Sequence, residues 1–157
     1  LEFRRVLFRS YELLIDNQTV KEKAFLVACG NASQYGNNAF IAPHANIQDG
    51  KMDITILSPF GPLDIAPLAI QLFTKQIDRN SKIKTFKGKE VTIIRQNPGV
   101  MHLDGEPIMA DSRIEISVLP KSLNVLTPET VSFTEEVQNL FGEVTRFFDK
   151  KLPYIFR

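Results

Sequence analysis

Short apolar runs, some of them alternating with polar residues, recur along the first three quarters of the chain and predict β-strands. The clearest run is 113–119, where apolar residues occupy every second position. Residues 52–57 and 90–95 show the same period of two, whereas 23–29 and 39–42 are almost entirely apolar, which is typical of buried strands. We therefore expect strands at residues 23–29, 39–42, 52–57, 90–95 and 113–119.

Turn-forming residues separate these predicted strands. They are Gly36-Asn37-Asn38, Asp49-Gly50, Lys87-Gly88-Lys89, Asn97-Pro98-Gly99 and Asp104-Gly105. Glycine and asparagine tolerate the positive φ that tight turns need, and proline fixes φ for a turn. Many short strands joined by frequent turns indicate a mainly β protein, an antiparallel sandwich or a barrel.

Two segments show helical spacing instead. In residues 67–77, Leu68, Leu72, Phe73 and Ile77 fall along one side, and Pro67 suits the first turn. The second segment begins at Ser132, where Glu135 three residues on completes a capping-box pattern. We expect one peripheral helix at 67–77 and an amphipathic C-terminal helix from residue 132.

The C-terminal helix has two interpretations. Its apolar stripe could lie on a membrane, or it could dock on protein. Residues 133–157 carry four basic and four acidic side chains, whereas interfacial helices usually favour lysine and arginine. The balance favours docking on the β-domain or on another domain. The basic residues are Arg146, Lys150, Lys151 and Arg157, and the acidic ones are Glu135, Glu136, Glu143 and Asp149.

The composition mainly excludes classes of protein. The 157 residues fit one domain with a sizeable core, 43% of them are hydrophobic, and the net charge of +1 gives no field that would attract nucleic acid. Cys29 is the single cysteine, so no internal disulfide forms. No apolar stretch approaches the roughly 20 residues of a membrane span.

The chain has an unusual beginning. Residues 1–10 read LEFRRVLFRS and contain no initiating methionine. We interpret them as a junction or leader and exclude them from functional reasoning, although a linker strand is an alternative. The predicted organisation is then a leader at 1–10, a β-domain at 11–131, and a C-terminal helix and tail at 132–157.

Three motifs in order carry a resemblance to a known family. They are Cys29-Gly30-Asn31 with Tyr35-Gly36-Asn37-Asn38, the run Ile41-Ala42-Pro43-His44 through Asp49-Gly50-Lys51-Met52-Asp53, and Leu103-Asp104-Gly105-Glu106. Together they resemble the C-terminal domain of the bacterial-type diacylglycerol and sphingosine kinase family, over about residues 24–128. The family's glycine triplet is Gly36-Asn37-Asn38 here, and His44 stands where the family more often has aspartate.

The resemblance implies an antiparallel β-sandwich with one or two peripheral helices. It also implies part of an ATP-dependent lipid kinase. The family's Gly-Gly-Asp-Gly-Thr nucleotide loop is not in this sequence. Because phosphoryl transfer needs a cradle for the nucleotide phosphates, we expect the chain alone to be inactive. The implied partners are a membrane lipid and ATP bound by another domain, and a homodimer is also open. The implied location is cytoplasmic, with peripheral attachment to the membrane.

The resemblance assigns catalysis to the Asp-Gly-Glu motif. Glu106 would accept or orient the proton of the lipid hydroxyl, and Asp104 would assist it. The alternative is a hairpin in which Asp104 and Gly105 make the turn and Glu106 is solvated.

The second motif resembles a structural magnesium loop of the bacterial branch. Asp49 would be the side-chain ligand, and Asn46 and Lys51 would supply carbonyl oxygens, which suit a hard cation. A plain Asp-Gly turn explains the same residues equally well. Asp53 could pair with a basic side chain or be exposed strand polarity.

The remaining candidates are less specific. Asn31 and Tyr35 lie where the family has its interdomain cleft, and they would line the path of the lipid or phosphate. An ordinary loop with a half-buried tyrosine is the alternative. His44 and His102 have no metal-ligand spacing, and Cys29 ends an apolar run, which favours a buried and inert thiol.

Two rival functions remain open from the sequence. One is a related kinase with a soluble acceptor such as nicotinamide dinucleotide. The other is a non-catalytic β-sandwich that binds lipid or protein.

Overall fold

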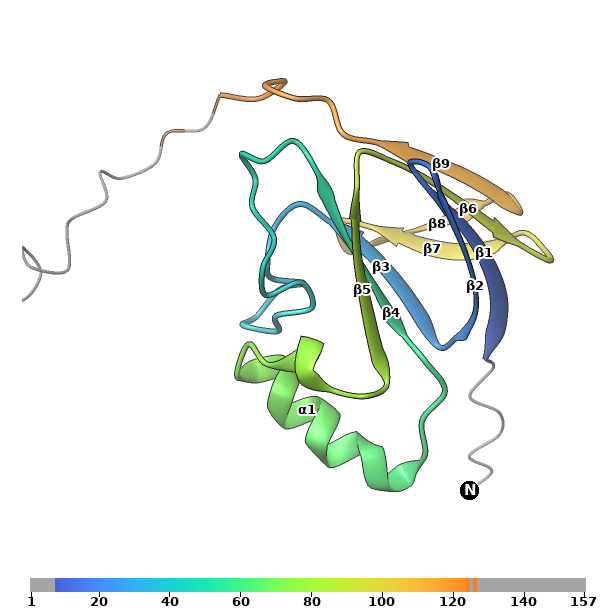
Figure 1. Cartoon of the computed structure of the whole chain (residues 1–157), viewed down its shortest axis with the longest axis vertical. Coiled ribbons are helices and arrows are strands. Elements are labelled where there is room, and N and C mark those ends of the chain that lie inside the picture. Colours follow the sequence, from blue (N-terminus) through green and yellow to red (C-terminus); the bar gives the residue numbers. More distant parts are fainter. Residues whose placement is uncertain (1–7, 125, 127–157) are drawn as a thin grey trace, which may run out of the picture. The chain divides into compact units, whose positions relative to one another are not determined.

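The structure is a computed structural model, and it describes residues 8–124 and 126. Strands of these residues form antiparallel sheets (Figure 1). The larger sheet has the order β2-β1-β6-β9, the second has the order β3-β4-β5, and β7 and β8 form a separate hairpin. The strands are β1 (Arg9–Ile15), β2 (Gln18–Ala24), β3 (Leu26–Gly30), β4 (Met52–Leu57), β5 (Ile83–Gly88), β6 (Glu90–Arg95), β7 (Gly99–Leu103), β8 (Glu106–Ala110) and β9 (Arg113–Ser117).

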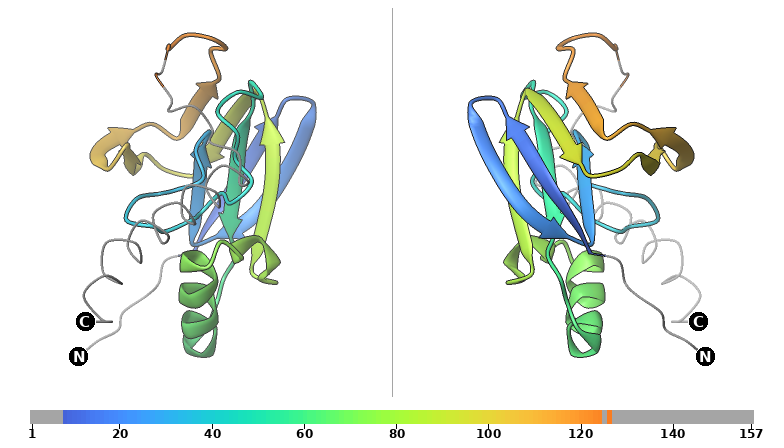
Figure 2. Two further views of the ribbon diagram at one scale, coloured as in Figure 1. Left: turned by 90° about the vertical axis from the view of Figure 1, so that its left-hand side faces the viewer. Right: turned by 90° about the vertical axis from the view of Figure 1, so that its right-hand side faces the viewer.

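The core lies where the two larger sheets meet. Inward-facing side chains of β1, β2 and β6 pack against those of β4, so the apolar faces of both sheets are buried together. Leu13, Ile54 and Ile56 are completely buried. This packing confirms the predicted antiparallel β-sandwich, and Figure 2 shows its layers from two sides. The buried core residues are Leu13, Ile15, Val20, Ala24, Met52, Ile54, Ile56, Val91 and Ile93.

Short helical elements connect β4 to β5. They are a 3-10 turn (Pro62–Asp64), helix α1 (Ile65–Phe73) and a second 3-10 turn (Ile77–Arg79). The helix packs near one end of the strands (Figure 1) through a small second core of Leu68, Ile77 and Ile83. The predicted helix at 67–77 is thus confirmed in its position, although it begins two residues earlier and ends at Phe73.

The strands predicted at 52–57 and 90–95 match β4 and β6, and the one at 113–119 ends at Ser117. Residues 23–29 are not one strand, because the chain breaks at Phe25 between β2 and β3. The strand expected at 39–42 was wrong: Ala39 makes only an isolated bridge to Gly36. Phe40 and Ala42 are nevertheless buried, which explains the apolar pattern.

Four strands had no sequence prediction of their own: β1, β5, β7 and β8. The larger sheet includes Arg9 and Ser10, the last two residues of the predicted leader. Phe8 packs edge-to-face against Phe25 and Phe60, with ring centroids 6.5 and 6.3 Å apart. The C-terminal helix expected from residue 132 lies outside the described residues.

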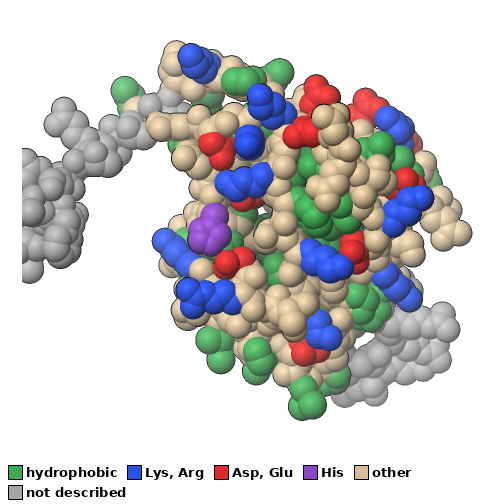
Figure 3. Space-filling model, viewed as in Figure 1, with side chains coloured by type: hydrophobic (Ala, Val, Ile, Leu, Met, Phe, Trp, Pro, Cys, Tyr) green, Lys and Arg blue, Asp and Glu red, His purple; other side chains and the backbone are tan. Residues whose placement is uncertain are grey.

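Hydrophobic side chains also gather on the surface around α1, along the lower edge of the view in Figure 3. Leu63 is 92% exposed, and Ile70 is 64% exposed. Among the residues that the structure describes, no helix is long and apolar enough to span a bilayer.

Candidate functional site

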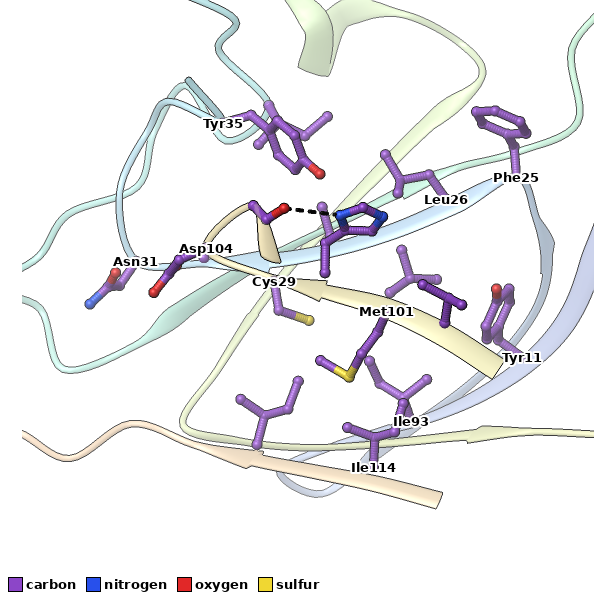
Figure 4. Close-up of a pocket in the computed structure, with 18 of the residues that line it drawn as sticks. Tyr11, Phe25, Leu26, Cys29, Asn31, Tyr35, Ile93, Met101, Asp104 and Ile114 are labelled. Carbon is purple, nitrogen blue, oxygen red and sulfur yellow. Dashed lines mark hydrogen bonds between the residues drawn. The ribbon is translucent and has the colours of Figure 1, made fainter. Parts of the chain in front are cut away.

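An open groove of about 820 Å³ runs along β3, the edge strand of the smaller sheet (Figure 4). Strands of the larger sheet contribute side chains such as Ile93 and Ile114, and β7 of the hairpin contributes Met101. The volume lies within the range of sites that bind small molecules. The groove therefore combines both layers of the sandwich with the separate hairpin.

Most of the groove lining is apolar. Leu26, Val27 and Cys29 of β3 line it together with Ile116 of β9. Burial raises the pKa of the Cys29 thiol to about 12, so the sulfur stays protonated at neutral pH and behaves as a small apolar group. The sequence prediction of an inert thiol agrees with this environment. This part of the lining suits a hydrocarbon chain, whereas Arg9 and Arg95 bring positive charge to the same groove.

One end of the groove is polar. Asn31, Tyr35 and Asp104 line this end, and Phe25 and Tyr11 lie toward the other (Figure 4). Tyr35 is 63% exposed, so it is not the half-buried side chain of the alternative interpretation. Two predicted substrate residues and one predicted catalytic residue thus come together at a single groove end. Their roles stay predictions.

The β7–β8 hairpin places Asp104. Asp104 and Gly105 form its two-residue turn with φ of 48° and 93°, the left-handed backbone that Asp-Gly pairs favour. Leu103 pairs directly with Glu106 across this turn. The hairpin expected from the alternative interpretation is therefore confirmed, and it leaves both carboxylates at the hairpin tip.

Glu106 lies just beyond the groove. It is the exposed first residue of β8, and it is not among the residues that line the groove. Because cross-strand partners share a face and side chains alternate along a strand, Glu106 is on the same hairpin face as Leu103 and Met101. Met101 reaches into the groove. Val100 and His102, from the opposite face of β7, line the groove as well, so both faces of this strand border it. Glu106 follows the Asp104-Gly105 turn at the polar end.

A buried arginine anchors this hairpin, and sequence reasoning missed it. Arg95 is 7% exposed, and its Nη2 donates to the carbonyl oxygens of Gly99 (2.7 Å) and Ala110 (2.5 Å). Its Nε donates to the carbonyl oxygen of Asp111 at 3.1 Å. The planar guanidinium therefore holds both strands of the hairpin, at their open end, against β6. Its polar neighbours in sequence, Gln96 and Asn97, gave no signal of burial.

The predicted magnesium loop is held by a lysine. Lys87 Nζ of β5 lies 3.3 Å from Asp49 Oδ2 and 3.2 Å from Asp53 Oδ2, and it donates to the carbonyl oxygen of His44 at 3.1 Å. Desolvation opposes the shift, but the two carboxylates raise the pKa of Lys87 above its usual range. Asp53 is 8% exposed, so the prediction that it pairs with a basic side chain is confirmed.

Both oxygens of Asp49 already have protein partners. The backbone N–H of Lys51 donates to Oδ1 at 2.9 Å and lowers the pKa of the carboxyl, and Lys87 pairs with Oδ2. Among the residues described, no group of three His, Cys, Asp or Glu side chains suits a metal ion. In this arrangement Lys87 pairs with the Asp49 oxygen that a cation would otherwise use. Magnesium binding by Asp49, Asn46 and Lys51 stays a prediction, and it requires Lys87 to move aside.

The two histidines have separate local roles. His44 Nε2 lies 3.3 Å from Asp78 Oδ2, which links the loop to the 3-10 turn before β5. His102 lines the groove, and its Nδ1 is 3.4 Å from the carbonyl oxygen of Gly105 in the hairpin turn. The two rings lie on different segments, the loop before β4 and the β7 strand.

The structure is thus a β-sandwich with a groove of mixed lining and an acidic hairpin tip at its polar end. Residues 2–127 match the model of the YegS C-terminal NAD kinase beta sandwich-like domain. The chain belongs to this family, which confirms the resemblance to lipid kinases read from the three motifs.

Curated and solved relatives agree with this assignment. The chain is 30% identical over 132 residues to a diacylglycerol kinase of Mycobacterium tuberculosis, which covers 82% of this chain and 38% of the relative. An uncharacterized protein of Synechocystis, sll0036, is 28% identical over 120 residues, 73% of this chain and 27% of its own. The chain spans 27% and 38% of the length of these two curated relatives.

Solved structures share the fold. A protein of Bacillus anthracis str. Sterne superimposes with a TM-score of 0.60 at 22% identity, over 74% of this chain and 37% of its own. A diacylglycerol kinase from the same strain gives 0.52 at 19% identity, over 75% of this chain and 45% of its own. The relatives that carry a functional name are kinases, so the domain is of kinase-family origin.

Proposed function

We propose that this chain is the lipid-binding and proton-accepting part of an ATP-dependent lipid kinase. The acceptor is a diacylglycerol-like lipid whose hydroxyl receives the γ-phosphoryl group. The observation that carries the proposal is the apolar groove with Asp104 at its polar end and Glu106 just beyond it. Membership in a family that includes diacylglycerol kinases supports the choice of acceptor.

The groove chemistry fits a lipid that enters with its hydrocarbon chain. The walls from β3 and β9 have no charge to solvate, so an acyl chain would replace water there at a gain in free energy. The polar groups at the other end would then face the glycerol and its hydroxyl. In this arrangement Asn31 and Tyr35 bind the headgroup by hydrogen bonds.

In the proposed reaction the lipid hydroxyl oxygen attacks the γ-phosphorus of ATP. A new phosphorus–oxygen bond forms, the bond from phosphorus to the ADP oxygen breaks, and the hydroxyl proton passes to the Glu106 carboxylate. Asp104 orients the hydroxyl from the neighbouring turn position. ATP with its magnesium would be held by polypeptide other than these 157 residues, and the enzyme would work at the membrane from the cytoplasm.

Steady-state turnover in a longer protein that contains this chain tests the carboxylate. Glu106→Gln keeps the size of the side chain but cannot accept the proton, and we expect kcat to fall by about 10²–10⁴-fold with the melting temperature unchanged. Glu115→Gln, an equal change at an exposed glutamate of β9, is the matched control and should keep full turnover.

Several outcomes contradict the proposal. Near-normal turnover of Glu106→Gln would remove this carboxylate from the mechanism. Phosphorylation of nicotinamide dinucleotide in preference to dispersed diacylglycerol would indicate the related soluble-acceptor kinase. Lipid binding with no turnover, even in the longer protein, would indicate a non-catalytic binding module. The 157-residue chain by itself is expected to bind lipid without turnover, because it has no Gly-Gly-Asp-Gly-Thr loop.

A further inference from the structure

Helix α1 and the turn before it carry an exposed apolar surface. We call it the α1 surface, and it consists of Leu63, Ile65, Ile70 and Phe73, which are exposed by 92, 55, 64 and 56%. Only Leu68 of the helix is buried. Large apolar side chains that gather on one surface mark sites where proteins or lipids bind. Packing against the core therefore accounts for the apolar residue on the inner side of the helix. It does not account for the apolar residues of the α1 surface.

The helix also lacks the polar face of an ordinary surface helix. Residues 65–73 read IAPLAIQLF and contain no charged side chain. A helix that simply covers a core usually turns charged residues to the solvent. Here the solvent side consists of the exposed Ile65, Ile70 and Phe73 together with small apolar residues. A helix of this kind gains free energy when its outer side enters an apolar phase.

The charges around the α1 surface are mainly basic. Residues 60–84 contain four basic and two acidic side chains, and both acids are paired, Asp64 with Lys82 and Asp78 with His44. Lys75, just after the helix, and Arg79, in the second 3-10 turn, are both exposed. Figure 3 shows Lys and Arg side chains beside the apolar groups on this face. Such a border attracts a surface of negative charge.

A second apolar surface gives a contrast. Val100, Leu103 and Met109 of the β7–β8 hairpin are exposed by 56, 58 and 71%. Residues 99–111, however, contain three acidic side chains and no lysine or arginine. An anionic surface would repel this hairpin. Charge thus distinguishes two surfaces that are similar in apolar exposure.

The α1 surface is continuous with the groove. Phe60 comes directly before the segment that forms the surface, and its ring lies 5.2 Å from that of Phe25 in an edge-to-face contact. Phe25 is 45% exposed and lines the groove at the end away from Asn31 and Asp104 (Figure 4). A hydrocarbon chain could therefore pass from the α1 surface over the rings of Phe60 and Phe25 into the groove. Arg9, the cross-strand partner of Ala24, also lines the groove.

We infer that the α1 surface is where the protein contacts a lipid bilayer with anionic headgroups, and that a lipid enters the groove from there past Phe25. The helix lies in the interface, with Ile70 and Phe73 among the acyl chains and Lys75 and Arg79 at the headgroups. This inference rests on the proposed function for the identity of the lipid that enters, but contact with the bilayer is measurable without any kinase activity.

The chain has no tryptophan, so a single one can report on its surroundings. Ile70→Trp should show a blue-shifted emission when vesicles of phosphatidylglycerol and phosphatidylcholine are added, together with quenching by brominated acyl chains. Met109→Trp, on the acidic hairpin, is the matched control and should show neither change. Raising the salt from about 0.05 to about 0.5 M should weaken the binding, because exposed charges are screened.

Co-flotation with the same vesicles gives the second measurement. Ile70→Asp should weaken binding by about tenfold or more, since it removes an exposed isoleucine that would enter the bilayer and adds a negative charge. Met109→Asp should bind like the unchanged chain. Thermal unfolding of both variants checks that they fold, and Leu63→Asp, at the most exposed position, repeats the test should Ile70→Asp unfold.

Three outcomes would overturn the inference. One is equal binding of neutral and anionic vesicles, and another is equal loss of binding in Met109→Asp. The third is a dimer that Ile70→Asp dissociates while the unchanged chain ignores vesicles, which would make a second copy the occupant. Vesicle binding that depends on Ile70, in a longer protein that contains this chain but has no lipid kinase turnover, would uphold this inference and reject the proposed function.

Discussion

At the scale of single residues, Lys87 is the side chain that joins the loop at 44–53 to the sandwich. Its ammonium pairs with the buried Asp53 and with Asp49. Lys87→Met should lower the free energy of unfolding by about 1–2 kcal/mol, because Asp53 loses its partner while water still reaches part of the site. Denaturant unfolding measures the difference, and Lys89→Met, on the same turn, is the matched control.

The effect of Lys87→Met depends on pH in a definite direction. The pKa of Asp49 is lowered in the folded state, first by the Lys51 N–H and then by Lys87, so its contribution is present above the ordinary value of 3.8 and is lost as the pH falls. The difference between Lys87→Met and the unchanged chain should therefore shrink on acidification. A difference that stays constant down to about pH 3 would contradict the ion-pair explanation.

Arg95 is the second residue with a large expected effect. Its guanidinium donates to backbone carbonyls at both ends of the β7–β8 hairpin. Arg95→Met should destabilise the chain by about 2–3 kcal/mol, since those carbonyls lose a charged donor. Hydrogen exchange in residues 99–111 should rise more than in β4.

Arg113→Met removes an exposed arginine that pairs with Glu115, and it should change hydrogen exchange little. Uniform exchange across the whole chain of Arg95→Met would show that the hairpin depends on global stability and not on this anchor.

At the scale of elements, the turn between β5 and β6 depends on glycine. A Cβ at Gly88 would lie 2.6 Å from Ile15 Cγ2 and 3.2 Å from Asp16 Oδ2. Asp16 also accepts the backbone N–H groups of Lys89 and Glu90, so this corner cannot easily shift. Gly88→Ala should cost about 1–3 kcal/mol of stability through overpacking.

Gly61→Ala is the comparison for that change. Its Cβ would meet only Asp64 Oδ2, at an ordinary 3.8 Å. Urea unfolding of the two variants should separate them clearly, and similar midpoints would show that the corner at Ile15 relaxes.

The elements that the sequence predicted well are those whose apolar residues pack into the core at every second position. In β4 and β6 the core imposes the spacing of apolar residues, and the pattern is visible without a structure. β2 reads as a polar segment, β5 contains Lys84 and Lys87, and β8 is exposed and too short to show a buried face. The opposite error occurred at Phe40 and Ala42, where a strand was predicted and the structure has a loop. A buried loop can have the same apolar composition as a strand.

The site was predictable only where one segment forms it. The Asp104-Gly105 turn follows from local backbone chemistry. The groove needs β3, the larger sheet and the hairpin together, and the role of Arg95 depends on carbonyls 4 to 16 residues away. No local pattern contains that information.

At the scale of the whole molecule, the groove is where all three sheets meet, and this predicts a size limit on the ligand. Met101 reaches into the groove from β7. Met101→Trp should fill part of the volume and weaken binding of long-chain diacylglycerol more than that of a short-chain form. Displacement of a fluorescent lipid measures both affinities, and Met109→Trp makes the same change outside the groove.

Equal loss for both chain lengths would place the hydrocarbon elsewhere. Equal loss in both variants would show that the hairpin itself had been disturbed. Unchanged affinity in Met101→Trp would mean that the groove has no part in lipid binding.

The position of β1 decides how this protein can be shortened. β1 begins at Arg9 and is an interior strand, paired with β2 on one side and β6 on the other. A truncation that starts at residue 11 would delete the Arg9–Ala24 and Ser10–Lys23 pairs and the backbone beside Phe8. A protein shortened from its N-terminus should therefore keep Phe8 and everything after it, whatever the origin of the residues that precede Phe8.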